Sequence, residues 1–110
     1  EGRFPAIHFG CMPPEKENLL EEAIKTSREA DAVILIVGTN SDWETEGNDR
    51  SELALPADQD KLIESVIKEN ANTVVVINSG SPVSMPWIND SNAILQSWFG
   101  GQEYGNALAD

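Results

Sequence analysis

The stretch that decides the fold is residues 31–38, DAVILIVG, in which six consecutive apolar residues end at a glycine. An unbroken apolar run of this kind is typical of a strand covered on both faces, as parallel strands of α/β proteins are. The pattern returns at residues 73–80, TVVVINSG, and in shorter form at residues 93–99, AILQSWF. We therefore predict three strands of a mostly parallel sheet.

Amphipathic segments alternate with these strands. Helices are predicted over residues 15–30, from Pro56 to about residue 70, and after the turn GGQEYG near the end of the chain. The buried stripes are predicted at Leu20, Ala23, Ile24 and Ser27 in the first helix and at Leu62, Ile63, Val66 and Ile67 in the second. Helix and strand in this order predict an α/β fold, specifically a three-layer α/β/α sandwich with a mostly parallel sheet.

Both ends of the chain indicate a piece of a longer protein. The sequence opens without methionine and stops at GNALAD, inside a predicted helix that lacks a cap. Residues 1–14 contain no motif and are expected to be the tail of an upstream segment or inserted module. Residues 15–110 are expected to be the first part of a truncated domain.

The composition limits the kinds of molecule that the chain is expected to bind. The 110 residues carry 7 basic and 19 acidic side chains, a formal charge of -12. This charge repels phosphate backbones and anionic lipid, so neither nucleic acid nor a membrane is expected as a partner, whereas a neutral sugar is not penalised. No apolar run reaches the roughly 20 residues of a membrane span. The single Cys11 and the single His8 exclude an internal disulfide and a zinc cluster, and no cofactor is expected.

One segment is unusually acidic. Residues 38–56, GTNSDWETEGNDRSELALP, place five carboxylates within eleven positions: Asp42, Glu44, Glu46, Asp49 and Glu52. The segment follows the first buried strand, and parallel sheets bind ligands outside the carboxyl ends of their strands. Its position therefore favours a role in a site.

Several roles fit these carboxylates. They can be solvated charge, helix caps or partners for Arg50, and Asp49 is predicted to brace the loop by pairing with that arginine. Calcium is another alternative because Asp42, Glu44 and Glu46 alternate, but their spacing is not that of an EF-hand loop.

General acid/base catalysis is the third alternative. A carboxyl group that donates a proton near neutral pH needs an apolar wall or neighbouring negative charge to raise its pKa. Trp43 offers the wall, the clustered acids offer the charge, and Gly47 permits a sharp turn that pushes the preceding side chain outward. The chemistry alone does not choose between Glu44 and Glu46.

Three stretches in order, WETEGNDRSELALP, NTVVVINSGSPVSMPW and AILQSWFGGQEYGNALAD, resemble the second α/β domain of glycoside hydrolase family 3, the β-glucosidase family. The resemblance covers about residues 30–110. It implies that residues 15–110 are the first part of that second domain. It also implies a retaining β-glucosidase of carbohydrate metabolism and polysaccharide degradation, which hydrolyses terminal non-reducing β-D-glucosyl residues without a cofactor.

The same resemblance implies how the catalytic groups are divided. The nucleophile of such enzymes is an aspartate in a separate (β/α)8 barrel domain of the same full-length chain. The general acid/base is a loop glutamate that corresponds to Glu46, with Glu44 as the second choice. Trp43 is expected either to stack on the sugar or to pack the loop. The isolated chain is expected to be inactive and only marginally stable. The alternative is a non-catalytic α/β module that binds carbohydrate or docks another domain.

Overall fold

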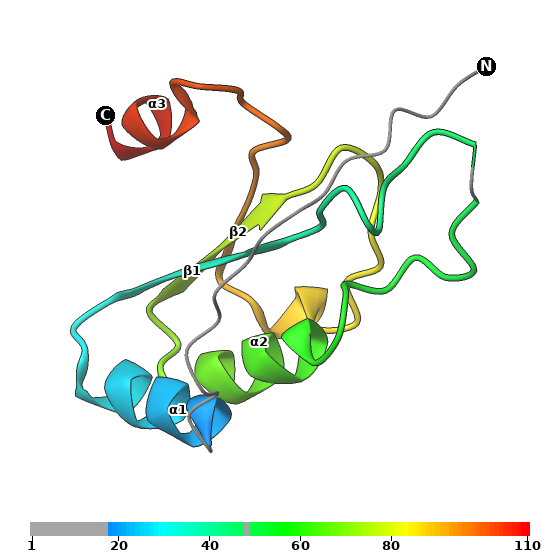
Figure 1. Ribbon diagram of the computed structural model, residues 1–110. Helices are drawn as coiled ribbons and strands as arrows, with labels where there is room; N and C mark the ends of the chain where they lie inside the picture. Colours follow the sequence, from blue (N-terminus) through cyan, green and yellow to red (C-terminus); the bar gives the residue numbers. More distant parts are fainter. Residues whose placement is uncertain (1–17, 48) are drawn as a thin grey trace.

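The computed structural model describes residues 18–47 and 49–110. The predictions for residues 1–14 and for the first residues of the helix predicted from Glu15 lie outside this range. The elements follow in the order α1 (Leu19–Glu29), β1 (Val33–Gly38), α2 (Gln59–Glu69), β2 (Thr73–Asn78), the 3-10 turn η1 (Ile88–Asp90), β3 (Ala93–Gln96) and α3 (Tyr104–Ala109). The predicted α/β class is confirmed (Figure 1). None of the described helices is long and apolar enough to cross a bilayer.

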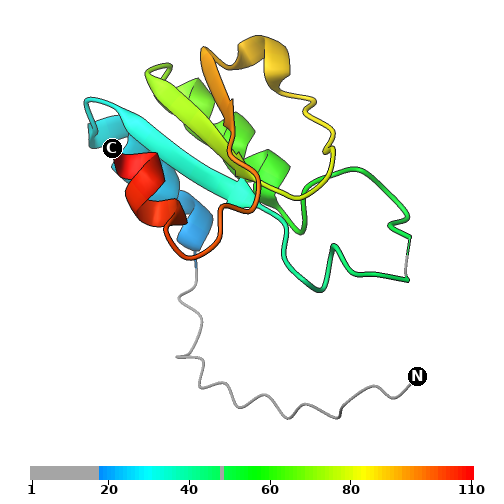
Figure 2. The same ribbon diagram turned by 90° about the horizontal axis from the view of Figure 1, so that it is seen from above.

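The three strands form one parallel sheet in the order β1-β2-β3. Strands β1 and β2 pair over their whole length, from Val33 opposite Thr73 to Gly38 opposite Asn78. Strand β3 is shorter and pairs with the four central residues of β2, from Val74 opposite Ala93 to Ile77 opposite Gln96. Because the strands are parallel, the segments that follow them all leave from the same edge of the sheet (Figure 2).

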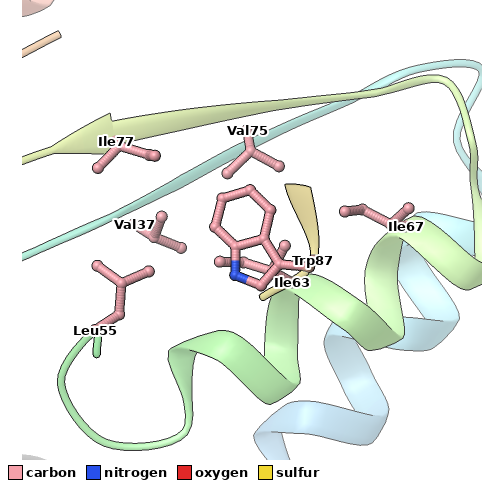
Figure 3. Close-up of a cluster of buried hydrophobic side chains, with 7 residues drawn as sticks. All are labelled: Val37, Leu55, Ile63, Ile67, Val75, Ile77 and Trp87. Atoms are coloured by element: carbon pink, nitrogen blue, oxygen red, sulfur yellow. The ribbon is translucent and has the colours of Figure 1, made fainter. Parts of the chain in front are cut away.

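One face of the sheet carries the hydrophobic core. Helix α2 packs on this face, and helix α1 packs beside α2 (Figure 1). Trp87 lies at the centre of the core (Figure 3). Its indole N–H donates to Asp60 Oδ1 at 2.8 Å, so the buried ring leaves no polar atom unpaired. The cluster consists of Val37, Leu55, Ile63, Ile67, Val75, Ile77 and Trp87. Burying each such side chain contributes roughly 1.5–3 kcal/mol, so this layer holds the domain together.

The opposite face of the sheet is exposed on β1 and β3 but not at the centre of β2, where Val76 is 2% exposed. The prediction that the strands are covered on both faces is therefore wrong for β1. Ile34 is 72% exposed and Ile36 is 57% exposed, and Leu95 on β3 is also exposed. Right-handed crossovers between strands that advance in one direction leave their connections on one face of the sheet. The connections β1-α2-β2 and β2-η1-β3 follow this rule, and the short α3 lies on the other side without burying these side chains (Figure 1).

Helix α2 begins later than predicted. The prediction placed its start at Pro56, whereas the helix begins at Gln59. Ala57 has φ +54°, a left-handed conformation that an α-helix cannot contain, so a turn precedes the helix. The buried stripe is confirmed, because Ile63, Val66 and Ile67 are all buried.

The third strand is shorter than predicted. It ends at Gln96, and Trp98 has φ +57°, which breaks the extended backbone. Trp87 lies in the core, whereas Trp98 is 54% exposed and is not part of the core.

Candidate active site

The candidate site lies at the carboxyl edge of the sheet, where two segments from different strands run side by side. The acidic segment follows β1, and residues 79–86 follow β2. Hydrogen bonds join them: Arg50 Nη2 donates to the Pro82 carbonyl at 2.8 Å, the Ser84 amide donates to the Leu53 carbonyl at 2.7 Å, and the Gly80 amide donates to Glu44 Oε1 at 3.2 Å. The segments extend together beyond the ends of the strands (Figures 1 and 2).

The start of the acidic segment is held by its own backbone and by α2. Asn40 forms a turn, because its carbonyl accepts the amides of Trp43 and Glu44 and its side-chain Oδ1 accepts the amide of Asp42. Gln59, the first residue of α2, bonds both backbone groups of Gly38, at 2.8 Å and 2.9 Å. These bonds fix the point where the chain leaves β1.

Glu44 lies at the junction of the two segments. Its Oε1 accepts the Thr39 hydroxyl at 2.5 Å and the Gly80 amide at 3.2 Å. The Ser81 hydroxyl also bonds this carboxylate, and the guanidinium of Arg50 adds positive charge beside it. One carboxylate thus contacts the ends of two strands.

These contacts decide the charge state of Glu44. Partial burial works to raise its pKa, but hydrogen bonds from Thr39, Ser81 and the Gly80 amide, together with the charge of Arg50, outweigh burial and lower the pKa below its usual value. Glu44 is therefore held as a carboxylate at neutral pH in this arrangement.

Gly80 allows the close approach. A Cβ at this position would lie 2.8 Å from Glu44 Oε2 and 2.8 Å from the ring of Phe99. Only a residue without a side chain lets the backbone amide reach the carboxylate here.

Glu46 has a different environment. Its side chain is exposed and forms no hydrogen bond or ion pair with another described residue. Gly47 follows with φ +83°, a conformation that favours glycine, and the turn predicted at this point is present. Glu46 is therefore presented to solvent, whereas Glu44 is enclosed by partners.

Trp43 and Arg50 line a shallow cavity beside Glu44. The cavity has a volume of about 420 Å³, and its walls are Trp43, Glu44, Thr45, Asp49, Arg50 and Ser81. Trp43 is half-buried, and its indole N–H and the Nη1 group of Arg50 are buried donors without an acceptor among the described residues. Buried donors are nearly always paired, so these two are exceptions within the fold.

The predicted ion pair between Asp49 and Arg50 is not formed. Asp49 is exposed, and its carboxylate does not come within ion-pair distance of the guanidinium. The Arg50 side chain instead crosses to the segment after β2 and donates to Pro82. A tertiary hydrogen bond therefore replaces the local pairing that sequence adjacency suggested.

The acids of the segment do not gather around a common point. Over residues 18–47 and 49–110, no group of three or more His, Cys, Asp or Glu side chains is placed to hold a metal ion. Asp42 is exposed, Glu44 points to the end of β2, and Glu46 points to solvent.

Comparison with known proteins gives a consistent result. The model of the glycosyl hydrolase family 3 C-terminal domain matches residues 7–110. A β-glucosidase of Rhizobium radiobacter is 46% identical over 105 residues, which cover 96% of this chain and 13% of that protein.

Solved structures agree with these sequence matches. The crystal structure of a β-glucosidase from Kluyveromyces marxianus in complex with glucose superposes with a TM-score of 0.84 at 42% identity, over 91% of this chain and 12% of that one. The structure of the GH3 β-glucosidase of Bifidobacterium adolescentis gives a TM-score of 0.79, also at 42% identity, over 91% of this chain and 15% of that one. The chain thus spans between 12% and 15% of the length of these relatives.

Proposed function

The chain belongs to glycoside hydrolase family 3, within the C-terminal domain of that family, and on this basis we propose that it is part of a retaining β-glucosidase and carries the general acid/base. The nucleophile is contributed by a separate barrel domain of the full-length protein. The proposal includes the division into residues 1–14, from an upstream segment, and residues 15–110, from the second domain. The names of the relatives support β-glucosidase activity.

The observation that carries the proposal is the pair of unequal glutamates at the carboxyl edge of the sheet. Glu46 is exposed beyond that edge, on a segment whose first residues are held by hydrogen bonds at Gly38 and Asn40. A group that protonates a leaving group held by another domain has to be accessible in this way. Glu44 fits the role less well, because its hydrogen bonds hold it as a carboxylate and occupy its oxygens.

The reaction follows from two carboxyl groups. Glu46, when protonated, donates to the glycosidic oxygen while the nucleophile of the barrel domain attacks the anomeric carbon. Ionised Glu46 then takes a proton from water, and the water releases the sugar with retained configuration. Retention requires the two carboxyl groups to lie about 5–5.5 Å apart, so the docking of the two domains has to bring them to this distance.

Trp43 is proposed as a binding residue for the part of the substrate beyond the cleaved bond. It lines the cavity between Glu44 and Arg50, and an indole ring can cover the apolar face of a sugar. The ring also packs the segment, so replacing Trp43 by Phe is the informative change. A rise in KM for disaccharides without a change for small aryl glucosides indicates sugar contact.

The experiment that tests the proposal is a leaving-group series with the Glu46→Ala variant of the full-length protein. We expect kcat/KM to fall about 10²–10⁴-fold for glucosides with poor leaving groups and much less for activated aryl glucosides, which need no proton. Asp42→Asn is the matched control, since it removes an exposed charge from the same segment. Equal, small losses over the whole series for Glu46→Ala would support a non-catalytic binding or docking module instead.

A further inference from the structure

We propose that Glu44 is a positioning residue, an ionised carboxylate that fastens segment 39–47 to the end of β2 and so fixes where Glu46 is presented. This inference rests on the proposed function of Glu46. It assigns to Glu44 a role distinct from proton transfer, which the acidic sequence of the segment does not specify.

The hydrogen bonds that Glu44 accepts come from the ends of two different strands. Thr39 is the residue directly after β1, and Gly80 is the second residue after β2. Both donate to the same oxygen of Glu44, at 2.5 Å and 3.2 Å. Hydrogen bonds to an ionised acceptor are roughly twice as strong as neutral ones, so Glu44 joins the two strand ends firmly.

Among the described residues, no other side chain next to Glu46 is attached to the rest of the fold. Towards the carboxyl end, the side chains of Thr45 and Glu46 are exposed, and Gly47 has no side chain. Glu44 is the last anchored side chain before Glu46, two residues away. Any movement of the Glu44 carboxylate is therefore passed to Glu46 through the backbone of Thr45 alone.

The residues around Glu44 leave space for its carboxylate and favour its negative charge. Gly80 leaves room for it where a Cβ would lie 2.8 Å from Oε2. Arg50 Nη2 donates to the Pro82 carbonyl at 2.8 Å, and the positive charge of the Arg50 guanidinium favours the ionised form of Glu44. A carboxylate that had to gain and lose a proton in each catalytic cycle would not be surrounded by donors.

The test compares conservative and truncating changes at both glutamates in the full-length protein. Glu44→Gln keeps an oxygen that accepts the Thr39 hydroxyl and the Gly80 amide, so kcat is expected to stay within about fivefold of the native value. Glu44→Ala removes the attachment, and a displacement of about 1 Å at a reacting group costs about 10²-fold in kcat. KM for an aryl glucoside is expected to change less than kcat, because Glu44 Oε1 is occupied by the Thr39 hydroxyl and the Gly80 amide.

The outcomes separate this inference from the proposed function. If Glu46→Gln is inactive while Glu44→Ala matches the native kcat, the positioning role is wrong and the function stands. If Glu46→Gln keeps full activity, the proposed function is wrong. If Glu44→Gln is as inactive as Glu44→Ala, then Glu44 itself transfers the proton and the inference is overturned.

A third variant covers the case in which Glu44→Ala does not fold. Thr39→Val keeps the shape of the side chain and removes only the hydroxyl that donates to Oε1. We expect it to fold and to lower kcat several-fold without a change in KM. A folded Thr39→Val protein with unchanged kcat would overturn the inference.

Discussion

At the scale of single residues, two glutamates separated by one threonine have opposite environments. Glu44 accepts hydrogen bonds from the ends of β1 and β2, whereas Glu46 has no partner among the described residues. The chemistry of the sequence left acid/base catalysis as one of three alternatives and did not choose between the two glutamates, whereas the family resemblance implied Glu46. The contacts that distinguish them come from Gly80 and Ser81, which lie 36 and 37 positions away from Glu44 and carry no sequence signal beyond their place after a strand.

The lowered pKa of Glu44 predicts a pH dependence of stability. A carboxyl group whose folded pKa lies below its unfolded value stabilises the folded state above that unfolded value, and this contribution is lost as the pH falls through the folded pKa. The ordinary value is 4.5, so the loss begins below about pH 4.5. We expect the native protein to have a higher Tm than Glu44→Gln at pH 7, with the difference shrinking at about pH 3.5.

Differential scanning fluorimetry of the full-length protein over this pH range measures the effect. Glu64→Gln is the matched control, since Glu64 is an exposed acid on α2 far from the segment. A difference in Tm that stays constant from pH 7 to pH 3.5 would contradict the assignment of Glu44 as an ionised group.

At the scale of elements, the two long helices are joined by side chains at their carboxyl ends. Asn70 Nδ2 donates to the carbonyls of Ser27 and Ala30, at 2.9 Å and 2.8 Å, and so closes the end of α1. An exposed ion pair between Arg28 and Glu69, at 2.8 Å, adds little, because surface pairs are screened by solvent.

Asn70→Ala is therefore expected to destabilise the fold. Two partly buried carbonyls lose their donor, and leaving such groups unpaired costs about 1–3 kcal/mol in the free energy of unfolding. Urea unfolding followed by the fluorescence of the buried Trp87 reports this loss. Glu69→Gln removes only the exposed pair and is expected to change the free energy of unfolding by less than about 1 kcal/mol.

The elements also show how far sequence reasoning reaches. Unbroken apolar runs predict the strands, and periodicity predicts the buried stripe of α2, because a helix on a sheet buries one face. The stripe of α1 is only partly buried, with Ser27 buried and Leu20, Ala23 and Ile24 half-buried. The apolar run of β1 did not predict its exposed face. Boundaries were less accurate where one residue adopts a left-handed backbone, at Ala57 before α2 and at Trp98 after β3. Neither residue type favours that conformation, so the tertiary structure imposes it and the sequence carries no sign of it.

The location of the candidate site was predicted, but the partners of its side chains were not. The position of the acidic segment after β1 follows from the rule that ligands bind at the carboxyl edge of a parallel sheet. The pairing of Asp49 with Arg50 was wrong, because it rested on adjacency in sequence, while Arg50 reaches Pro82. Long-range partners of this kind depend on how the two segments pack together.

At the scale of the whole molecule, the exposed apolar side chains on one face of the sheet are expected to make the isolated chain self-associate. Ile34 and Ile36 of β1 and Leu95 of β3 are exposed on the same side of the sheet, and Val76 of β2 is buried between Ile36 and Leu95. Exposed apolar surface of this kind promotes association.

We expect residues 1–110, expressed alone, to self-associate at micromolar concentration. Sedimentation velocity over a concentration series measures this association. The double change Ile34→Thr and Ile36→Thr keeps β-branched side chains on the edge strand and should shift the chain towards monomer. A native chain that remains monomeric and unfolds in a sharp, reversible transition would contradict the expectation.

The central claim is that Glu46 transfers the proton in a site shared with another domain, and azide rescue tests it most directly. In Glu46→Ala, no base activates water, so the glucosyl-enzyme intermediate formed from an activated aryl β-glucoside persists. Azide needs no base and attacks this intermediate. The measurement is product analysis by NMR after turnover of the full-length variant with azide. The account predicts faster turnover and β-glucosyl azide as the product. An unchanged rate, with glucose as the sole product, would contradict it.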